Sequence, residues 1–187
     1  NQVCRSIDEK IDEDFKEATR YVVEFDRVRP IYEHHLTWDF EEYQKQEHTV
    51  NSLKKDMDKF ANWEKELERM RARQTCGILE VESRRLKTSM MPMTTEKMHS
   101  LKTLVKDLAR TKCKHQLEQF HVRIQKLTQR PAHLKEFAAQ MEAVTAIQRE
   151  EKGIIKHTSW VEQMYHLLQG YDVNVPPEDL VLLDEMR

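Results

Sequence analysis

The sequence is poor in the residues that interrupt helices, with only 3 glycines and 5 prolines among 187 residues. Glycine supplies the backbone freedom that tight β-turns require, and glycine-rich loops cradle phosphate groups in nucleotide-binding enzymes. A sequence with so little glycine predicts long helices separated by a few breaks. We therefore expect its function to depend on helix surfaces rather than on a pocket built from loops.

Cysteine is also scarce. Cys4, Cys76 and Cys113 are far apart and odd in number, and they have neither a metal-ligand nor a redox spacing. This pattern indicates unpaired thiols in a reducing compartment, as in the cytoplasm.

Long apolar runs and targeting signals are missing as well. No stretch approaches the roughly 20 apolar residues that span a bilayer, and no signal peptide is recognisable, so we expect no membrane partner. The chain begins at Asn1 without a methionine and stops at Arg187 within a periodic stretch. We expect it to be a piece of a longer polypeptide.

Neither sign of charge dominates the sequence. It has 31 Lys and Arg against 33 Asp and Glu, for a formal net charge of -2, so nucleic acid is not an expected partner. Charged residues make up 34% of the chain and hydrophobic residues 39%. This balance is typical of helices with one buried stripe and a charged outer face.

Recognisable chemistry is absent from the sequence. Among the nine histidines, His34 and His35 are adjacent and would point about 100° apart on a helix, while His115 and His121 have a poor spacing for shared metal coordination. The acidic clusters, such as residues 12–14, fall between the apolar positions and are expected to face water. We therefore predict no catalytic residue, no cofactor site and no metal site, and expect that this segment is not an enzyme.

Four stretches carry apolar residues at spacings of three and four, which predicts four helices with one buried face each. Residues 1–30 are expected to be the end of a preceding helix, closed by Pro30. A second helix, with Thr37 as its N-cap, is expected to run from Trp38 to Arg73. Its apolar seam comprises Leu36, Phe40, Tyr43, Val50, Leu53, Met57, Phe60, Leu67 and Met70.

Residues 74–93 differ from the helices around them. Gly77 permits a helix stop with positive φ, and Pro92 closes the segment. We expect an extended crossing there, near residues 75–93, and a new helix from Thr94 or Thr95.

These elements predict an all-α fold, an elongated bundle of long antiparallel helices with one extended crossing segment. The expected organisation is a long helical pair over residues 31–130 that includes the crossing at 74–93, and then a long helix over 131–175. Pro131 can serve as the first residue of that helix, and Gly170 ends it. The start of a further helix follows over 176–187.

Two kinds of side chain are candidates for partner contacts. Glu47 and Glu64 occupy two positions of the second apolar seam. Either the seam is open to solvent there, or these carboxylates meet a partner helix that carries Lys or Arg. The large or flexible apolar candidates are Trp38, Trp63, Trp160, Met90 and Met91.

Three stretches, taken in order, resemble a known family. Trp38-Asp39 precedes a long aromatic-rich helix that ends near Trp63. Residues 77–87 read GILEVESRRLK and are followed by Met91-Pro92. Residues 164–168 (MYHLL) are followed by 171–179 (YDVNVPPED). This order is similar to the tail of axonemal dynein heavy chains, in which a Gly-x-x-x-Val-x-Ser-x-x-Leu-Lys crossing links two long helices and the last stretch lies just before the linker domain. The run at 90–93 departs from the family, where a leucine and often a second proline are expected.

The resemblance implies a non-catalytic tail segment, immediately N-terminal to the linker, that anchors the motor. ATP and Mg would bind in the downstream motor of the full chain. The implied partners are dynein intermediate and light chains, neighbouring heavy chains and docking proteins on the doublet microtubule, within the ciliary or flagellar axoneme. The alternatives are a spectrin-like helical rod and a coiled-coil adaptor of the cytoskeleton.

Overall fold

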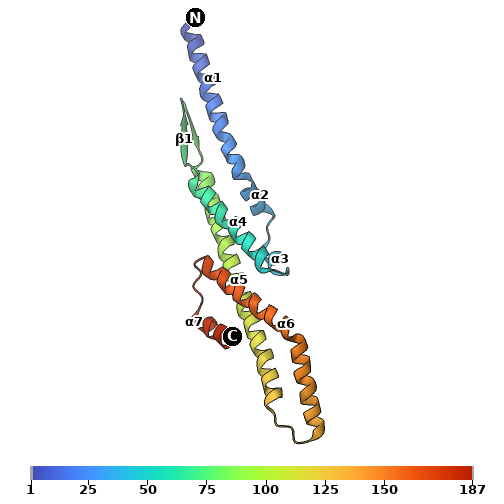
Figure 1. The fold of residues 1–187 in the computed structure, drawn as a ribbon. Helices are drawn as coiled ribbons and strands as arrows, with labels where there is room; N and C mark the ends of the chain where they lie inside the picture. The colour runs from blue at the N-terminus through green and yellow to red at the C-terminus, as the bar shows by residue number, and fades with distance from the viewer. Residues whose placement is uncertain (1, 187) are drawn as a thin grey trace. The chain divides into compact units, whose positions relative to one another are not determined.

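The computed structural model describes residues 2–186, and it is mainly helical (Figure 1). The prediction of a mostly helical chain is confirmed, while the elongated antiparallel bundle stays a prediction. The helices are α1 (Gln2–Val22), a 3-10 turn η1 (Val23–Arg27), α2 (Arg29–Thr37), α3 (Phe40–Gln44), α4 (Val50–Arg69), α5 (Arg84–Thr128), α6 (Leu134–Gly170) and α7 (Pro177–Met186). Two short strands, β1 (Arg73–Cys76) and β2 (Leu79–Glu82), lie between α4 and α5.

The chain divides into two compact units. The first contains the residues up to His48 together with Lys54–Leu101, and the second contains Thr49–Leu53 together with the residues from Lys102 onward. The long helix α5 contributes to both units, which is a different division from the one expected at residues 30, 130 and 175. Residue 187, the end of the last expected helix, lies outside the described residues.

The prediction of one helix from Trp38 to Arg73 is wrong, because the structure has two separate helices there, α3 and α4. Asp39, and not Thr37, is the N-cap of α3, and its side chain accepts a 2.8 Å hydrogen bond from the Glu41 amide. After α3, the ring of His48 bonds to the Tyr43 carbonyl, and α4 starts just beyond Thr49. Local side-chain bonds to the backbone thus outcompete helix continuation in this polar stretch.

The start of α4 has a capping arrangement that sequence reasoning missed. The Thr49 amide donates to the Ser52 hydroxyl at 3.0 Å, and the Ser52 amide donates to the Thr49 hydroxyl at 3.1 Å. Two of the unpaired amides at the helix start are satisfied in this way, as in a capping box.

The extended crossing is confirmed only at its beginning. β1 and β2 form an antiparallel hairpin in which Cys76 pairs with Leu79, leaving a two-residue loop of Gly77 and Ile78. Gly77 has a φ of +61° and Ile78 does not have a positive φ, as in a type II′ turn. Gly77 is therefore placed where a tight turn requires glycine.

The remainder of the expected crossing is helical, so the predicted helix start at Thr94 or Thr95 is wrong. α5 begins at Arg84 and continues through Pro92. A proline inside a helix removes one backbone hydrogen bond and costs about 3 kcal/mol. Burial of Met90, Met98 and Leu101 at helical spacing around it compensates, because each is at most 5% exposed.

Prolines begin helices elsewhere in the chain. Pro30 does not close the first helix, which ends at Val22, but lies in the first turn of α2. Pro131 lies in the connection before α6, which starts at Leu134, so it is not the first residue of that helix. Gly170 is the last residue of α6, as predicted, and Pro177 is the first residue of α7.

Each unit has its own buried residues. In the first unit, Val28, Ile31, Leu67 and Met90 form one cluster. In the second, Val161, Met164, Tyr165 and Leu168 of α6 are buried, as is Cys113 of α5. No described helix is long and apolar enough to cross a membrane.

Candidate functional site

Two of the predicted contact residues, Trp38 and Trp63, belong to an aromatic cluster in the first unit. His34, near the end of α2, stacks on Trp38 with ring centroids 6.1 Å apart and meets Trp63 edge-on at 4.9 Å. Phe60 of α4 contacts both tryptophan rings at 5.8 and 5.5 Å. The cluster joins α2 to α4, and both tryptophans are half-buried.

Lys97 of α5 completes this cluster although it is only 8% exposed. Its Nζ lies 5.0 Å from the Trp38 ring centroid and donates a 3.3 Å hydrogen bond to the carbonyl of His34. A cation near the C-terminal carbonyls of a helix is favourable, and so is a cation over an indole ring. Burial, followed by the nearby Lys59, lowers the pKa of Lys97.

The same surroundings keep His34 neutral. Burial, then Lys59 and Lys97, lower the pKa of His34 to about 4, and the negative charge of Asp56 opposes them. Its Nδ1 is buried and has no hydrogen-bond partner among the described residues. The arrangement packs and positions helices, and it offers no base near neutral pH.

Met90 and Met91 also contribute to internal packing. Met90 is 3% exposed in the cluster with Val28, Ile31 and Leu67, and Met91 packs against that cluster. Met90 is therefore covered by this chain itself. Whether the tryptophans or Met91 also contact a partner stays a prediction.

The other candidates are dispersed. Glu47 lies in the connection between α3 and α4 and is exposed, so its assignment to an apolar helix seam is wrong. Glu64 is half-buried on α4, and Trp160 is half-buried on α6 in the second unit. The structure therefore brings Trp38 and Trp63 together in one cluster through His34 and Phe60.

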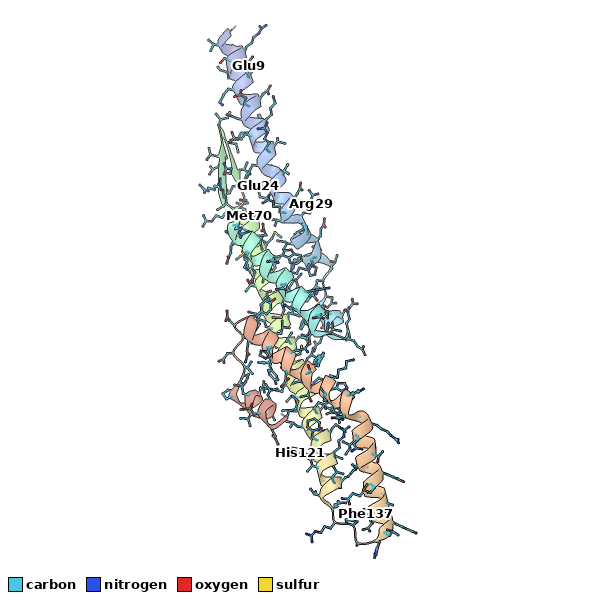
Figure 2. All side chains as sticks on the ribbon, viewed as in Figure 1. Glu9, Glu24, Arg29, Met70, His121 and Phe137 are labelled. Atoms are coloured by element: carbon cyan, nitrogen blue, oxygen red, sulfur yellow. The ribbon has the colours of Figure 1, made fainter. Side chains whose placement is uncertain are left out.

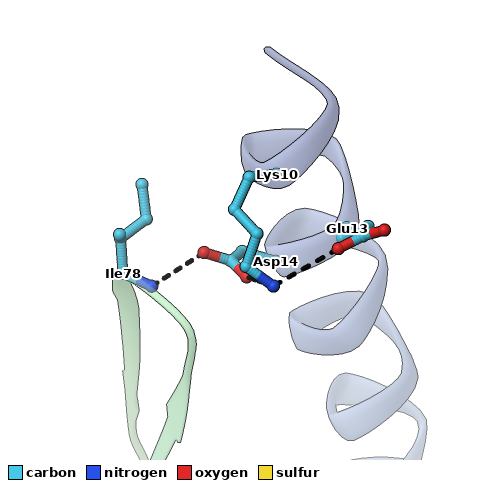
Figure 3. Close-up of polar contacts among 4 residues, drawn as sticks. All are labelled: Lys10, Glu13, Asp14 and Ile78. Atoms are coloured by element: carbon cyan, nitrogen blue, oxygen red, sulfur yellow. Dashed lines mark hydrogen bonds and ion pairs between the residues drawn. The ribbon is translucent and has the colours of Figure 1, made fainter. Parts of the chain in front are cut away.

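A buried carboxylate attaches the hairpin to α1 (Figure 3). Asp14 is 2% exposed, and its Oδ2 accepts a 2.9 Å hydrogen bond from the Ile78 amide in the hairpin turn. Lys10, one turn earlier on α1, lies 3.6 Å from the other carboxylate oxygen and also pairs with Glu13. Sequence reasoning placed this acidic cluster entirely in water and missed the contact.

A second buried carboxylate lies in the second unit. Asp179, in the first turn of α7, is 1% exposed, and its Oδ1 accepts a 2.7 Å hydrogen bond from Arg110 of α5. Hydrogen bonding to Asp179 and its negative charge raise the pKa of Arg110. This pair holds the start of α7 against α5.

The end of α5 and the start of α6 form a helical hairpin, which we call the α5–α6 tip (residues 118–160). Figure 2 shows His121 on its first helix and Phe137 on its second. No side chain between 118 and 160 is buried, although all of these residues are described. Several large apolar side chains of the tip are more than half exposed: Ile124, Leu134, Phe137, Met141 and Ile155.

Metal chemistry finds no support within residues 2–186, because no group of three or more His, Cys, Asp and Glu side chains there could hold an ion. The arrangement of the chain offers helix surfaces and inter-helix contacts.

Comparisons with known proteins add a distant relative. No family model matches the chain. The chain is similar to dynein axonemal heavy chain 6 of Homo sapiens, with 21% identity over 185 residues, which is 99% of this chain and 4% of that protein. The chain thus spans a small fraction of that relative's length. The similarity supports a dynein-like helical region.

Proposed function

We propose that this chain is a non-catalytic segment of a dynein heavy chain tail, which anchors the motor and takes part in assembly with other dynein subunits. The observation that carries the proposal is the extent of the similarity, since it runs over 185 residues and leaves almost no part of the chain outside it. A mostly helical structure agrees with it.

The finer parts of the proposal follow from the family. Partners would be intermediate and light chains, neighbouring heavy chains and docking proteins on the doublet microtubule, in the cytoplasm of the ciliary or flagellar axoneme. The segment itself would bind no cofactor, and ATP and Mg would be used in the downstream motor. Its position would be immediately before the linker.

The structure supports a mechanical role through its long helices. α5 has 45 residues and α6 has 37. Such helices carry their backbone hydrogen bonds along their axes, which suits the transmission of load. The buried carboxylates of Asp14 and Asp179 each join two elements that are distant in sequence, through Ile78 and Arg110 respectively.

Crosslinking mass spectrometry on axonemes from cells that express the chain would test the proposal. Lysines on three elements serve as reporters: Lys54 and Lys65 on α4, Lys87 on α5 and Lys135 on α6. We expect crosslinks to dynein intermediate chains, other heavy chains or docking proteins. Crosslinks confined to actin-associated proteins, or ATP turnover by the purified chain, would contradict it.

The spectrin-like alternative requires three helices of similar length in a regular period. Here the lengths range from 5 residues in α3 to 45 in α5, and a β-hairpin interrupts the series. The coiled-coil adaptor requires a stable parallel dimer. Sedimentation equilibrium of the purified chain distinguishes that alternative.

A further inference from the structure

We propose that the side of the α5–α6 tip that carries a basic groove binds an acidic amphipathic helix of a partner protein. This inference names the chemistry of one partner in the assembly role proposed above, and it rests on that role.

The groove consists of two hollows between the helices. One has a volume of about 450 Å³ and is lined by residues that include His115, Arg123, Arg149 and Gly153. The other has a volume of about 540 Å³ and includes Lys126, Arg130 and Ala143. Both hollows are bounded by α5 on one side and α6 on the other.

The sequence spacing shows that the hollows continue into one another. The lining residues of α5 recur at intervals of three and four, which places them in one row along the helix. This row is His115, Gln119, Arg123 and Lys126, and Arg130 lines the hollow from the connection that follows α5. On α6, Ala139, Ala143, Glu150 and His157 form the facing row at intervals of four and seven. A groove that follows two helices over several turns has the dimensions of a third helix.

The charge of the groove is positive. No acidic residue occurs between 119 and 135, a stretch with four Lys and Arg residues. Of the two lining carboxylates, Glu150 pairs with Arg123 at 2.7 Å, and Glu136 accepts a 2.7 Å hydrogen bond from the Ala132 amide. Arg149, Lys126 and Arg130 have no ion pair within residues 2–186. These three cations fit carboxylates supplied from outside the chain.

The tip also lacks a core of its own. Two helices of this length with no buried side chain between 118 and 160 gain little from burial, and helices in water depend on tertiary packing. Gly153 increases this instability, because glycine inside a helix costs about 1 kcal/mol relative to alanine. A Cβ on Gly153 would meet no atom within 4 Å, so nothing inside the chain requires glycine there. A third helix in the groove would supply the missing contacts.

Nucleic acid fits this groove less well than a helix does. Proteins that bind single strands offer aromatic side chains on which bases stack, and no Phe, Tyr or Trp side chain lines either hollow. The floor contains Ala139, Ala143 and Ile154, which suits the apolar face of an amphipathic helix.

The test measures binding of fluorescent synthetic helices to the purified 187-residue chain by anisotropy. The probe is a 22-residue peptide with Leu and Ala on one face and Glu at three- and four-residue spacing beside it. The comparison peptide has Lys in place of every Glu. We expect the acidic peptide to bind at least about tenfold more tightly, which corresponds to about 1.4 kcal/mol, with affinity falling as salt rises.

Matched variants locate the binding. Arg130→Glu with Arg149→Glu should weaken the acidic peptide about tenfold, whereas Lys16→Glu with Arg20→Glu on α1 makes the same charge change away from the groove and should have little effect. Gly153→Leu should also weaken binding by filling the groove. Since leucine favours helix more than glycine, circular dichroism should show no loss of helix in that variant.

Equal binding of both peptides, or groove variants that bind as the unchanged chain does, would overturn the proposal. A single-stranded DNA of equal charge that displaces the acidic peptide fully would also overturn it, in favour of nucleic acid. These results do not depend on the axoneme crosslinks. Binding without dynein crosslinks would reject the tail assignment alone, and crosslinks without binding would reject the groove alone.

Discussion

The carboxylate of Asp14 occupies the space that a side chain on Gly77 would need. A Cβ built on Gly77 would overlap the carboxyl group of Asp14, and the φ of +61° is one that other residues rarely adopt. The hairpin turn and the buried acid of α1 therefore depend on each other. Glycine lets the Asp14 carboxylate approach, and the carboxylate satisfies the exposed turn amide of Ile78.

Gly77→Ala should consequently detach the hairpin from α1. The positive φ and the clash with Asp14 together should cost about 2 kcal/mol. Hydrogen exchange would show faster exchange at the Ile78 amide and across β1 and β2, with little change in α6.

Gly153→Ala is the matched control, because it is the same substitution in an open helical position. It should stabilise the chain by about 1 kcal/mol. If both variants had the same effect on the free energy of unfolding, the proposed dependence between Gly77 and Asp14 would be wrong.

The three- and four-residue spacing of apolar residues predicted that the chain is helical, but it did not predict where the helices end. The apolar spacing predicted the helical character of the chain and the burial of Leu53, Met57, Phe60 and Leu67. It could not show the break before Val50, since the apolar spacing resumes in nearly the same phase after the polar residues 45–49. The cap signal at Thr49 and Ser52 would have located that break.

At Pro92 the opposite error occurred, because a helix boundary was predicted where the structure has a continuous helix. A local rule predicted a helix boundary there, yet burial of Met90, Met98 and Leu101 decided the conformation. Such tertiary packing is not visible in a single sequence.

The aromatic cluster was not predicted from the sequence, which singled out Trp38 and Trp63 only as candidate partner contacts. Both tryptophans pack with His34 and Phe60 of the same chain, and Lys97 lies over the Trp38 ring. The basic row on α5 could have been found, since its members recur at helical spacing in a stretch without acidic residues. The burial of Asp14 had no signal in the sequence, because its partner is a backbone amide 64 residues away.

Met90 should be important for stability, in contrast to the exposed apolar residues of the tip. Met90→Ala would leave a cavity among Val28, Ile31 and Leu67, at a cost of about 2–4 kcal/mol. Leu134→Ala, at a residue that is 84% exposed, should change stability by less than about 0.5 kcal/mol. Urea unfolding of both variants would measure the difference, and equal losses would contradict the assignment of Met90 to the core.

The two single substitutions in the Arg110–Asp179 pair should destabilise the protein to different extents. Arg110→Ala leaves a carboxylate that is 1% exposed without its cation, whereas Asp179→Ala leaves a side chain that is 33% exposed and can reach water. We expect the first variant to lower Tm by about 5 °C more than the second.

Replacing both partners by apolar residues, as in Arg110→Met with Asp179→Leu, should recover most of the stability that Arg110→Ala loses. The reason is that the destabilisation arises from the unpaired buried charge. Calorimetry on the three variants would decide the matter. A double variant that is less stable than Arg110→Ala would show that the pair contributes more than charge compensation.

His34 should make the stability of the first unit sensitive to acid. The unfolded chain binds a proton at this residue near pH 6.5, whereas in the folded chain burial, Lys59 and Lys97 lower the pKa to about 4. Between these values the unfolded state holds more protons, so stability falls as the pH drops from 6.5 towards 4. Because His34 is only partly buried, we expect its share of the loss to be about 2 kcal/mol.

Urea unfolding at pH 7 and pH 4.5 would measure this effect in the unchanged chain and in His34→Asn. The carboxylates titrate in both chains, so the difference between the two pH-dependent losses isolates His34.

Lys97→Met supplies an independent check. It keeps the packing on Trp38 but removes a cation beside His34, and should therefore raise the pKa of His34, as read from its ring proton shifts in an NMR titration. An unchanged pKa in that variant would mean that burial and Lys59 set it, and that Lys97 acts only through its contacts with Trp38 and the His34 carbonyl.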